Sequence, residues 1–171
     1  LGASGELKTK PAQNAVRELR GLGIVPDVLV GRSEFEPPHE AVQKLSLFSG
    51  VEEEAIVLLP NAKTIYQVPL TLEERGIGTV ITRKLNLKSG KPKLANWTEL
   101  VGRATDQTAP IIKVGVVAKY LNNQDTYMSV FEALKAAAWD KKHQVEIEWI
   151  DAEKVTVSNA ESMLKNVDGI V

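Results

Sequence analysis

The amino-acid sequence predicts an α/β fold in two parts, with strands that are mostly parallel. Short apolar runs at 28–30 and 56–59 alternate with segments whose apolar residues recur at helical spacing, as in parallel sheets. A polar, turn-rich stretch at 88–93 interrupts this pattern, and a strongly apolar run at 111–117 begins it again. A hydrophobic content of 43% in 171 residues is enough for one domain or for two small ones.

The first part is expected to open with a helix at 13–22, whose residues Val16, Leu19 and Leu22 share one side. The run at 28–30 predicts a strand covered on both faces. It leads to Arg32, at the edge where open α/β sheets present ligand-binding loops. The apolar spacing then predicts a helix around Val42, Leu45 and Phe48, a buried strand at 56–59, and short helices at 70–76 and 80–87.

The second part is expected to follow a linker centred on the stretch at 88–93. A helix around Trp97, Leu100 and Val101 is predicted between that stretch and the new strand. Ser158 and Glu161 have the spacing of a capping box, which predicts a helix start. The other expected elements are a strand at 111–117, a helix at 125–140 with Val130, Leu134 and Ala137 on one face, a strand at 145–150 and a strand beginning at 169.

Composition excludes several classes of function. With 21 basic and 22 acidic residues the net charge is -1, so we expect no nucleic-acid partner, and any anion site must be a local cluster. No apolar run reaches the roughly 20 residues that span a bilayer, and no signal-peptide pattern is present, so we expect no membrane partner and a cytoplasmic protein. The absence of cysteine excludes a disulfide, a thiolate metal site and a cysteine nucleophile within these residues.

The segment Lys8-Thr9-Lys10-Pro11 has the character of an anion site. Its two lysines supply point charges, Thr9 is expected to cap the helix, and Pro11 suits a first turn whose free N–H groups attract phosphate. A solvated, capped helix start explains the same residues, so spacing alone leaves both interpretations open.

Other chemistry-bearing residues have simpler explanations. His39 and His143 are expected to be surface or loop residues, because they are far apart in the sequence and lack companion ligands. The three adjacent carboxylates at 52–54 point in different directions and predict a solvated face. Packing is the expected role of Trp97, Trp139 and Trp149.

Several blocks of the sequence, in one order and covering essentially the whole chain, resemble the CTP synthase family. The blocks are 4–6, 8–13, 16–24, 26–30, 44–48, 65–70, 72–76, 114–120, 125–127, 146–151 and 167–171. The resemblance implies parts of two doubly wound, mostly parallel domains. It places the end of a P-loop-like amidoligase (synthase) domain at 1–87, a linker at 88–110 and the first half of a class I glutamine amidotransferase-like domain at 111–171.

The resemblance also implies site residues. The UTP/CTP-binding positions of the family are matched by Lys8, Thr9, Lys10, Pro11, Ala12, Gln13 and Lys44, and the ATP-binding positions by Arg32 and Ala62. No catalytic residue and no metal ligand is expected here, because Mg²⁺ bound with ATP would take its ligands from sequence outside this segment. From the residues alone, Lys44 is better explained as an exposed helix lysine. The chain departs from the family pattern at three positions: Ala12 replaces threonine, Gly31 replaces cysteine, and Ala118 replaces a glycine.

The resemblance implies an internal segment of an ATP-dependent carbon–nitrogen ligase. In the intact enzyme, ATP phosphorylates UTP, and ammonia from glutamine then displaces the phosphate to give CTP in pyrimidine biosynthesis. GTP would be an effector, and the enzyme a homotetramer. The segment alone is expected to be inactive. The alternatives are a non-catalytic nucleotide-sensing module and an assembly element derived from the same family.

Overall fold

The computed structural model describes residues 7–88, 90–121 and 124–171, so the block at 4–6 lies outside the described residues. The chain forms two compact units, Leu1–Thr98 and Glu99–Val171, which are considered separately. The division falls inside helix α5 (Ala95–Thr105), within the stretch 88–110 that the family resemblance implies as a linker. The assignment of the two parts to particular enzyme domains stays a prediction.

The first unit contains two parallel strands, β1 (Leu29–Ser33) and β2 (Ile56–Pro60), paired from Leu29 opposite Ile56 to Ser33 opposite Pro60. Helix α2 (His39–Ser49) precedes the short 3-10 helix η1 (Glu53–Ala55) in the connection between them. The first four residues of β2 are buried, as predicted. The prediction that β1 is covered on both faces is wrong, because Val30 is 54% exposed.

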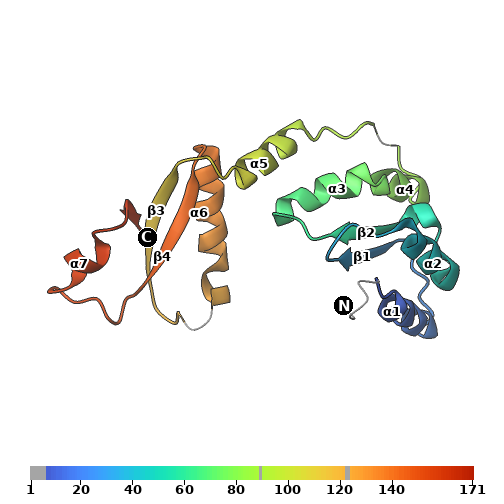
Figure 1. The fold of residues 1–171 in the computed structure, drawn as a ribbon, viewed down its shortest axis with the longest axis horizontal. Coiled ribbons are helices and arrows are strands. Elements are labelled where there is room, and N and C mark those ends of the chain that lie inside the picture. Colours follow the sequence, from blue (N-terminus) through green and yellow to red (C-terminus); the bar gives the residue numbers. More distant parts are fainter. Residues whose placement is uncertain (1–6, 89, 122–123) are drawn as a thin grey trace. The chain divides into compact units, whose positions relative to one another are not determined.

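Helices flank these strands, and α2 and α3 (Val68–Glu74) pack against β2. Helix α1 (Lys10–Gly21) lies on one side, and α3 lies on the other (Figure 1). The 3-10 helix η2 (Ile65–Gln67) leads into α3, and α4 (Ile77–Lys84) completes the unit. The core is built around Leu45, Val57 and Ile77, so the helices and the buried strand share one apolar centre.

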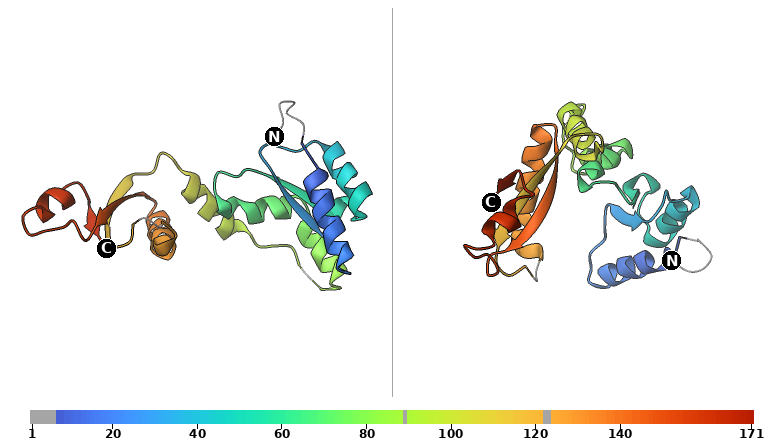
Figure 2. Two further views of the ribbon diagram at one scale, coloured as in Figure 1. Left: turned by 90° about the horizontal axis from the view of Figure 1, so that it is seen from below. Right: turned by 60° about the vertical axis from the view of Figure 1, so that its left-hand side comes forward.

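The second unit contains three parallel strands in the order β4-β3-β5. These are β3 (Ile111–Ala118), β4 (Gln144–Asp151) and the short β5 (Gly169–Ile170). The 3-10 helix η3 (Gln124–Tyr127) leads into helix α6 (Met128–Asp140), which lies along the strands in Figures 1 and 2, and α7 (Ala160–Leu164) precedes β5. The strand order reverses at β3, as in doubly wound sheets.

Two details of the second unit differ from the sequence-based expectation. Ala137 is exposed, whereas Ala138 and Trp139 carry the buried face of α6. The predicted capping box is absent, because α7 starts after Asn159, whose side-chain oxygen accepts a bond from the Thr156 amide instead.

Of the three tryptophans, Trp139 is buried, while Trp97 and Trp149 are 36% and 37% exposed. Trp139 therefore has the predicted packing role, whereas Trp97 and Trp149 are only partly buried. Within the described residues, no helix has both the length and the apolar composition required to cross a bilayer.

Candidate functional site

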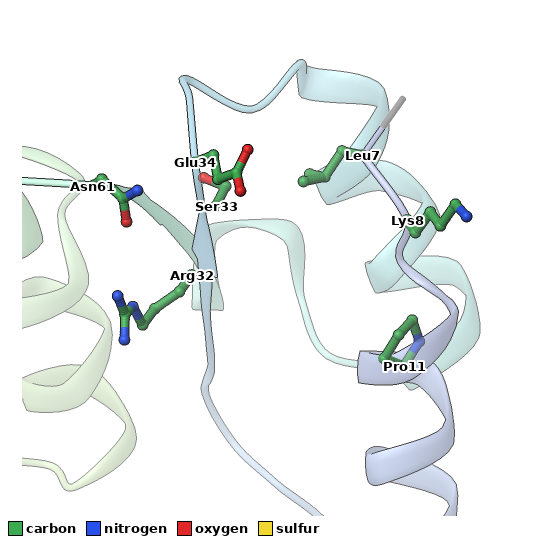
Figure 3. Close-up of a pocket in the computed structure, with 7 residues that line it drawn as sticks. All are labelled: Leu7, Lys8, Pro11, Arg32, Ser33, Glu34 and Asn61. Carbon is green, nitrogen blue, oxygen red and sulfur yellow. The ribbon is translucent and has the colours of Figure 1, made fainter. Parts of the chain in front are cut away.

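An open pocket of about 580 Å³ lies between the start of α1 and the carboxyl end of β1 (Figure 3). Its wall is formed by Leu7, Lys8, Pro11, Arg32, Ser33, Glu34 and Asn61. Arg32 and Ser33 are the last two residues of β1, and Asn61 directly follows β2. The pocket therefore occupies the edge of the parallel strands at which α/β proteins bind ligands.

A second pocket of about 380 Å³ shares Arg32 and Asn61 with the first. Its remaining wall residues are Leu59, Pro60, Ala62, Ile65 and Val68. Ala62, one of the two predicted ATP-site residues, thus lines the same pocket as the other, Arg32. The second pocket is mostly apolar, apart from these two shared side chains, which gives it one polar end and one apolar end.

Arg32 is the common charged residue of both pockets. Its side chain is exposed, and in the described part of the chain it forms no ion pair. A guanidinium presents five N–H donors in a planar fork that suits phosphate or carboxylate oxygens. Glu34 lies on the wall of the first pocket, so that pocket carries charges of both signs.

At the start of α1, Thr9 and Gln13 bond to each other. The Gln13 Nε2 atom donates a 2.9 Å hydrogen bond to the Thr9 Oγ1 atom, and both residues are buried. Thr9 occupies the N-cap position with helical dihedral angles and makes no side-chain cap. The prediction that Thr9 caps the helix is therefore wrong, since its hydroxyl accepts from Gln13. Pro11 does stand in the first turn, as predicted.

The other predicted nucleotide residues are distributed over α1 and α2. Lys8 lines the first pocket, but Figure 3 shows its side chain directed away from Arg32. Lys10, the first residue of α1, and Lys44, on α2, are exposed and line neither pocket. Ala12 packs against the apolar core of the unit. The structure thus brings Lys8, Pro11 and Arg32 together, and nucleotide contact by any of these residues stays a prediction.

Four residues of the first pocket's wall, Leu7, Ser33, Glu34 and Asn61, were not among the predicted site residues. A signal was available for Ser33 and Asn61, because each directly adjoins a predicted residue at the carboxyl end of a strand. Ser33 has a structural bond as well: its Oγ atom donates to the Leu59 carbonyl oxygen at 3.3 Å and ties β1 to β2.

The carboxylates at 52–54 are exposed, as predicted, and they are paired. Arg83 binds both Glu52 and Glu54 through its side-chain nitrogens. The hydrogen bond from Arg83 lowers the pKa of Glu54, and the same bond raises the pKa of Arg83. Exposed His39 lies 3.6 Å from Glu53. Among the residues that the structure describes, no group of three or more His, Asp or Glu side chains is arranged to hold a metal ion.

Comparison with known proteins gives a consistent result. Residues 1–87 match the sequence model of the family described as CTP synthase N-terminus. The whole chain is 44% identical to the CTP synthase of Pelotomaculum thermopropionicum, of which it covers 32%. It is 43% identical over 167 residues (98% of the chain) to the CTP synthase of Methanococcus maripaludis, covering 31% of that protein. It is 40% identical over its full length to that of Carboxydothermus hydrogenoformans, covering 32%. The chain therefore spans about a third of the length of these relatives.

Proposed function

Because the chain belongs to the CTP synthase family, we propose that it is the nucleotide-binding segment of a CTP synthase. In this proposal the complete enzyme is a ligase that uses ATP and glutamine-derived ammonia to convert UTP into CTP. Lys8, Lys10 and Lys44 attract the phosphates of UTP, or of CTP as an inhibitor, while Arg32 and Ala62 belong to the ATP site. None of these residues transfers a proton.

The observation that carries the proposal is the position of Arg32 in the wall of both pockets. One pocket also contains the start of α1, and the other contains Ala62 and apolar side chains. A nucleotide needs a cationic contact for its phosphates and an apolar surface for its base, and the second pocket offers both. The exposed Lys10 and the free N–H groups at the start of α1 add a second positive region beside the first pocket.

Mg²⁺ would enter with ATP and shield the phosphate charge. The described residues supply Glu34 as the one carboxylate on the pocket walls, and a magnesium ion usually takes one or two carboxylates together with substrate oxygens. Following the family resemblance, we nevertheless assign the protein ligands of this ion to sequence outside the chain, and we give Glu34 no role as a ligand. The roles proposed for Arg32 and the lysines do not depend on this ion.

For residues 111–171 we propose the first half of the glutamine amidotransferase-like domain. The support is the parallel order β4-β3-β5, in which the chain passes from one side of β3 to the other. Glutamine as substrate, GTP as effector, a homotetramer and a cytoplasmic location belong to the same proposal for the complete enzyme.

The test is nucleotide binding by the purified protein, measured by calorimetry with Mg-ATP. Arg32→Ala is expected to weaken ATP binding about tenfold to a hundredfold, because a hydrogen bond to a charged group contributes about 1.5–3 kcal/mol. Arg17→Ala is the matched control, since Arg17 is an exposed arginine of the same unit that lines neither pocket. Equal ATP affinity in the two variants would remove Arg32 from the site.

A further inference from the structure

The start of helix α5 is attached to the first unit by an aromatic contact. The Trp97 Nε1 atom donates a 2.6 Å hydrogen bond to the backbone carbonyl oxygen of Tyr66. The two rings also contact each other, with centroids 6.3 Å apart and planes inclined by 48°. We call Tyr66 and Trp97 the aromatic clasp. It follows a stretch, residues 90–94, that has no helix or strand and would not by itself fix the position of α5.

The clasp adjoins the second pocket directly. Tyr66 is the middle residue of η2, Ile65 before it lines the pocket, and so does Val68 at the start of α3. The Ile65 side chain is 74% exposed, which leaves an apolar surface for a ligand to cover. A ligand in this pocket would therefore touch the chain on both sides of the carbonyl group that holds Trp97.

The geometry of η2 connects these two contacts. The Tyr66 amide donates to the Thr64 Oγ1 atom at 3.4 Å, and the turn continues without a break into α3. Ordering Ile65 and Val68 against a ligand also orders the Tyr66 carbonyl oxygen, because Ile65 adjoins Tyr66 and Val68 lies two positions after it. A more ordered acceptor makes a stronger attachment for Trp97.

We propose that the second pocket and the aromatic clasp are energetically coupled, so that a nucleotide in the pocket strengthens the attachment of the first turn of α5. The inference rests on the proposed function, because it takes the occupant of the pocket to be ATP. Coupling between two sites is reciprocal. Loss of the clasp therefore lowers the affinity for nucleotide by the same factor by which bound nucleotide strengthens the clasp. The remainder of α5 belongs to the second unit, which puts the coupling at the point where the chain passes from one unit to the next.

The experiment is backbone hydrogen exchange of the purified protein with and without Mg-ATP, combined with ATP titrations of two variants. Trp97→Phe keeps an aromatic ring and removes the N–H donor. Trp149→Phe is the matched control, a tryptophan of similar exposure that contacts Tyr127 in the second unit. We expect Mg-ATP to slow exchange at both 60–68 and 95–101, and Trp97→Phe to raise the dissociation constant for ATP about fivefold or more, while Trp149→Phe leaves it unchanged.

Two results would overturn the coupling alone: slower exchange at 60–68 without any change at 95–101, or unchanged ATP affinity in Trp97→Phe. If Mg-ATP slows exchange at neither segment, the proposed ATP site fails and the coupling fails with it. Hydrogen exchange at 60–68 therefore distinguishes failure of the coupling from failure of the proposed ATP site.

Discussion

The side-chain amide of Gln13 bonds to the hydroxyl of Thr9 at 2.9 Å, one helical turn apart, and both residues are more than nine-tenths buried. Both belong to the segment that the sequence predicts to bind UTP or CTP. Their bond uses one lone pair of the Thr9 hydroxyl oxygen and one of the two amide hydrogens of Gln13. Part of this segment therefore fixes the start of α1, beside the residues that reach the pocket.

Replacing Thr9 by valine is expected to destabilise the first unit. The change leaves the buried Gln13 amide without its acceptor, and such a loss costs about 1–3 kcal/mol. The free energy of unfolding, measured by urea denaturation, should fall by that amount. Thr98→Val is the control, because the Thr98 hydroxyl also bonds a residue four positions away, the Leu94 carbonyl, but at an exposed site.

The double variant Thr9→Val, Gln13→Leu separates a structural role from a ligand-binding one. Replacing both partners by apolar groups of similar shape is close to neutral, so most of the lost stability should return. A double variant as unstable as the sum of the single changes would show that the pair does not act as a unit.

Lys10→Glu is expected to weaken UTP binding about tenfold to a hundredfold, since a charged contact of about 1.5–3 kcal/mol is lost and replaced by repulsion. The substitution should not unfold α1. Its first turn contains no acidic residue, and an acidic residue at that position is stabilising. Calorimetry with UTP checks the effect, with exposed Lys165→Glu in the second unit as the control. An unchanged UTP affinity would remove Lys10 from the site.

Most of the strands and long helices were predictable because their apolar residues recur with a clear period. The strands at 56–59, 111–117 and 145–150 are present as β2, β3 and β4. The exposure of Val30 was not predictable, because an apolar run does not reveal how many neighbours cover a strand. The prediction of a capping box failed for a local reason. The side-chain oxygen of Asn159 competes for the backbone donors and accepts a hydrogen bond from the Thr156 amide.

For the site, the sequence indicated which residues adjoin the sheet edge but not how their side chains point. Arg32 and Ala62 line one pocket because the parallel pairing of β1 and β2 aligns their carboxyl ends. The direction of the Lys8 side chain and the bond between Thr9 and Gln13 depend on packing around α1, which no residue spacing encodes. Ala118, a departure from the family pattern, lies buried at the end of β3 and needs no glycine, because positive φ falls on Tyr120 instead.

Gly31, where the family pattern has cysteine, lies against the side chain of Leu58. A Cβ atom at Gly31 would lie 2.7 Å from the Leu58 Cδ2 atom, so Gly31→Cys must displace that side chain. We expect a loss of about 1–3 kcal/mol in the free energy of unfolding from overpacking. Adding Leu58→Val should recover part of it by removing the clashing methyl group. Equal stability of Gly31→Cys and the unmodified protein in thermal denaturation would mean that Leu58 moves at no cost.

Asp106 is expected to remain ionised to unusually low pH. The Thr108 hydroxyl and backbone amide donate to its Oδ1 atom at 2.7 and 2.8 Å, and these bonds, the hydroxyl first, hold the pKa below its ordinary value of 3.8. Because the folded-state pKa is lowered, the stabilising contribution is complete above pH 3.8 and disappears as the pH falls through the folded-state pKa.

Thr108→Val should therefore raise the pKa of Asp106 toward its ordinary value, and an NMR titration of the carboxyl carbon measures the change. Asp151 is the internal control, because the Glu153 amide and Lys154, not Thr108, lower its pKa. Identical Asp106 titration midpoints with and without the hydroxyl would contradict this assignment of cause.

Limited proteolysis tests the boundary between the two parts of the chain. Residues 90–93 are exposed and lie outside any helix or strand, and proteases cut such backbone first. Trypsin should therefore cleave after Lys93 before it cleaves within α1 or β3, and mass spectrometry identifies the first products. Nucleotide should slow this cut if the aromatic clasp tightens, because Trp97 lies only four residues beyond Lys93. First cleavage within α1 or β3, with the bond after Lys93 protected, would place the boundary elsewhere, since a well-packed helix or strand exposes its backbone only by local unfolding.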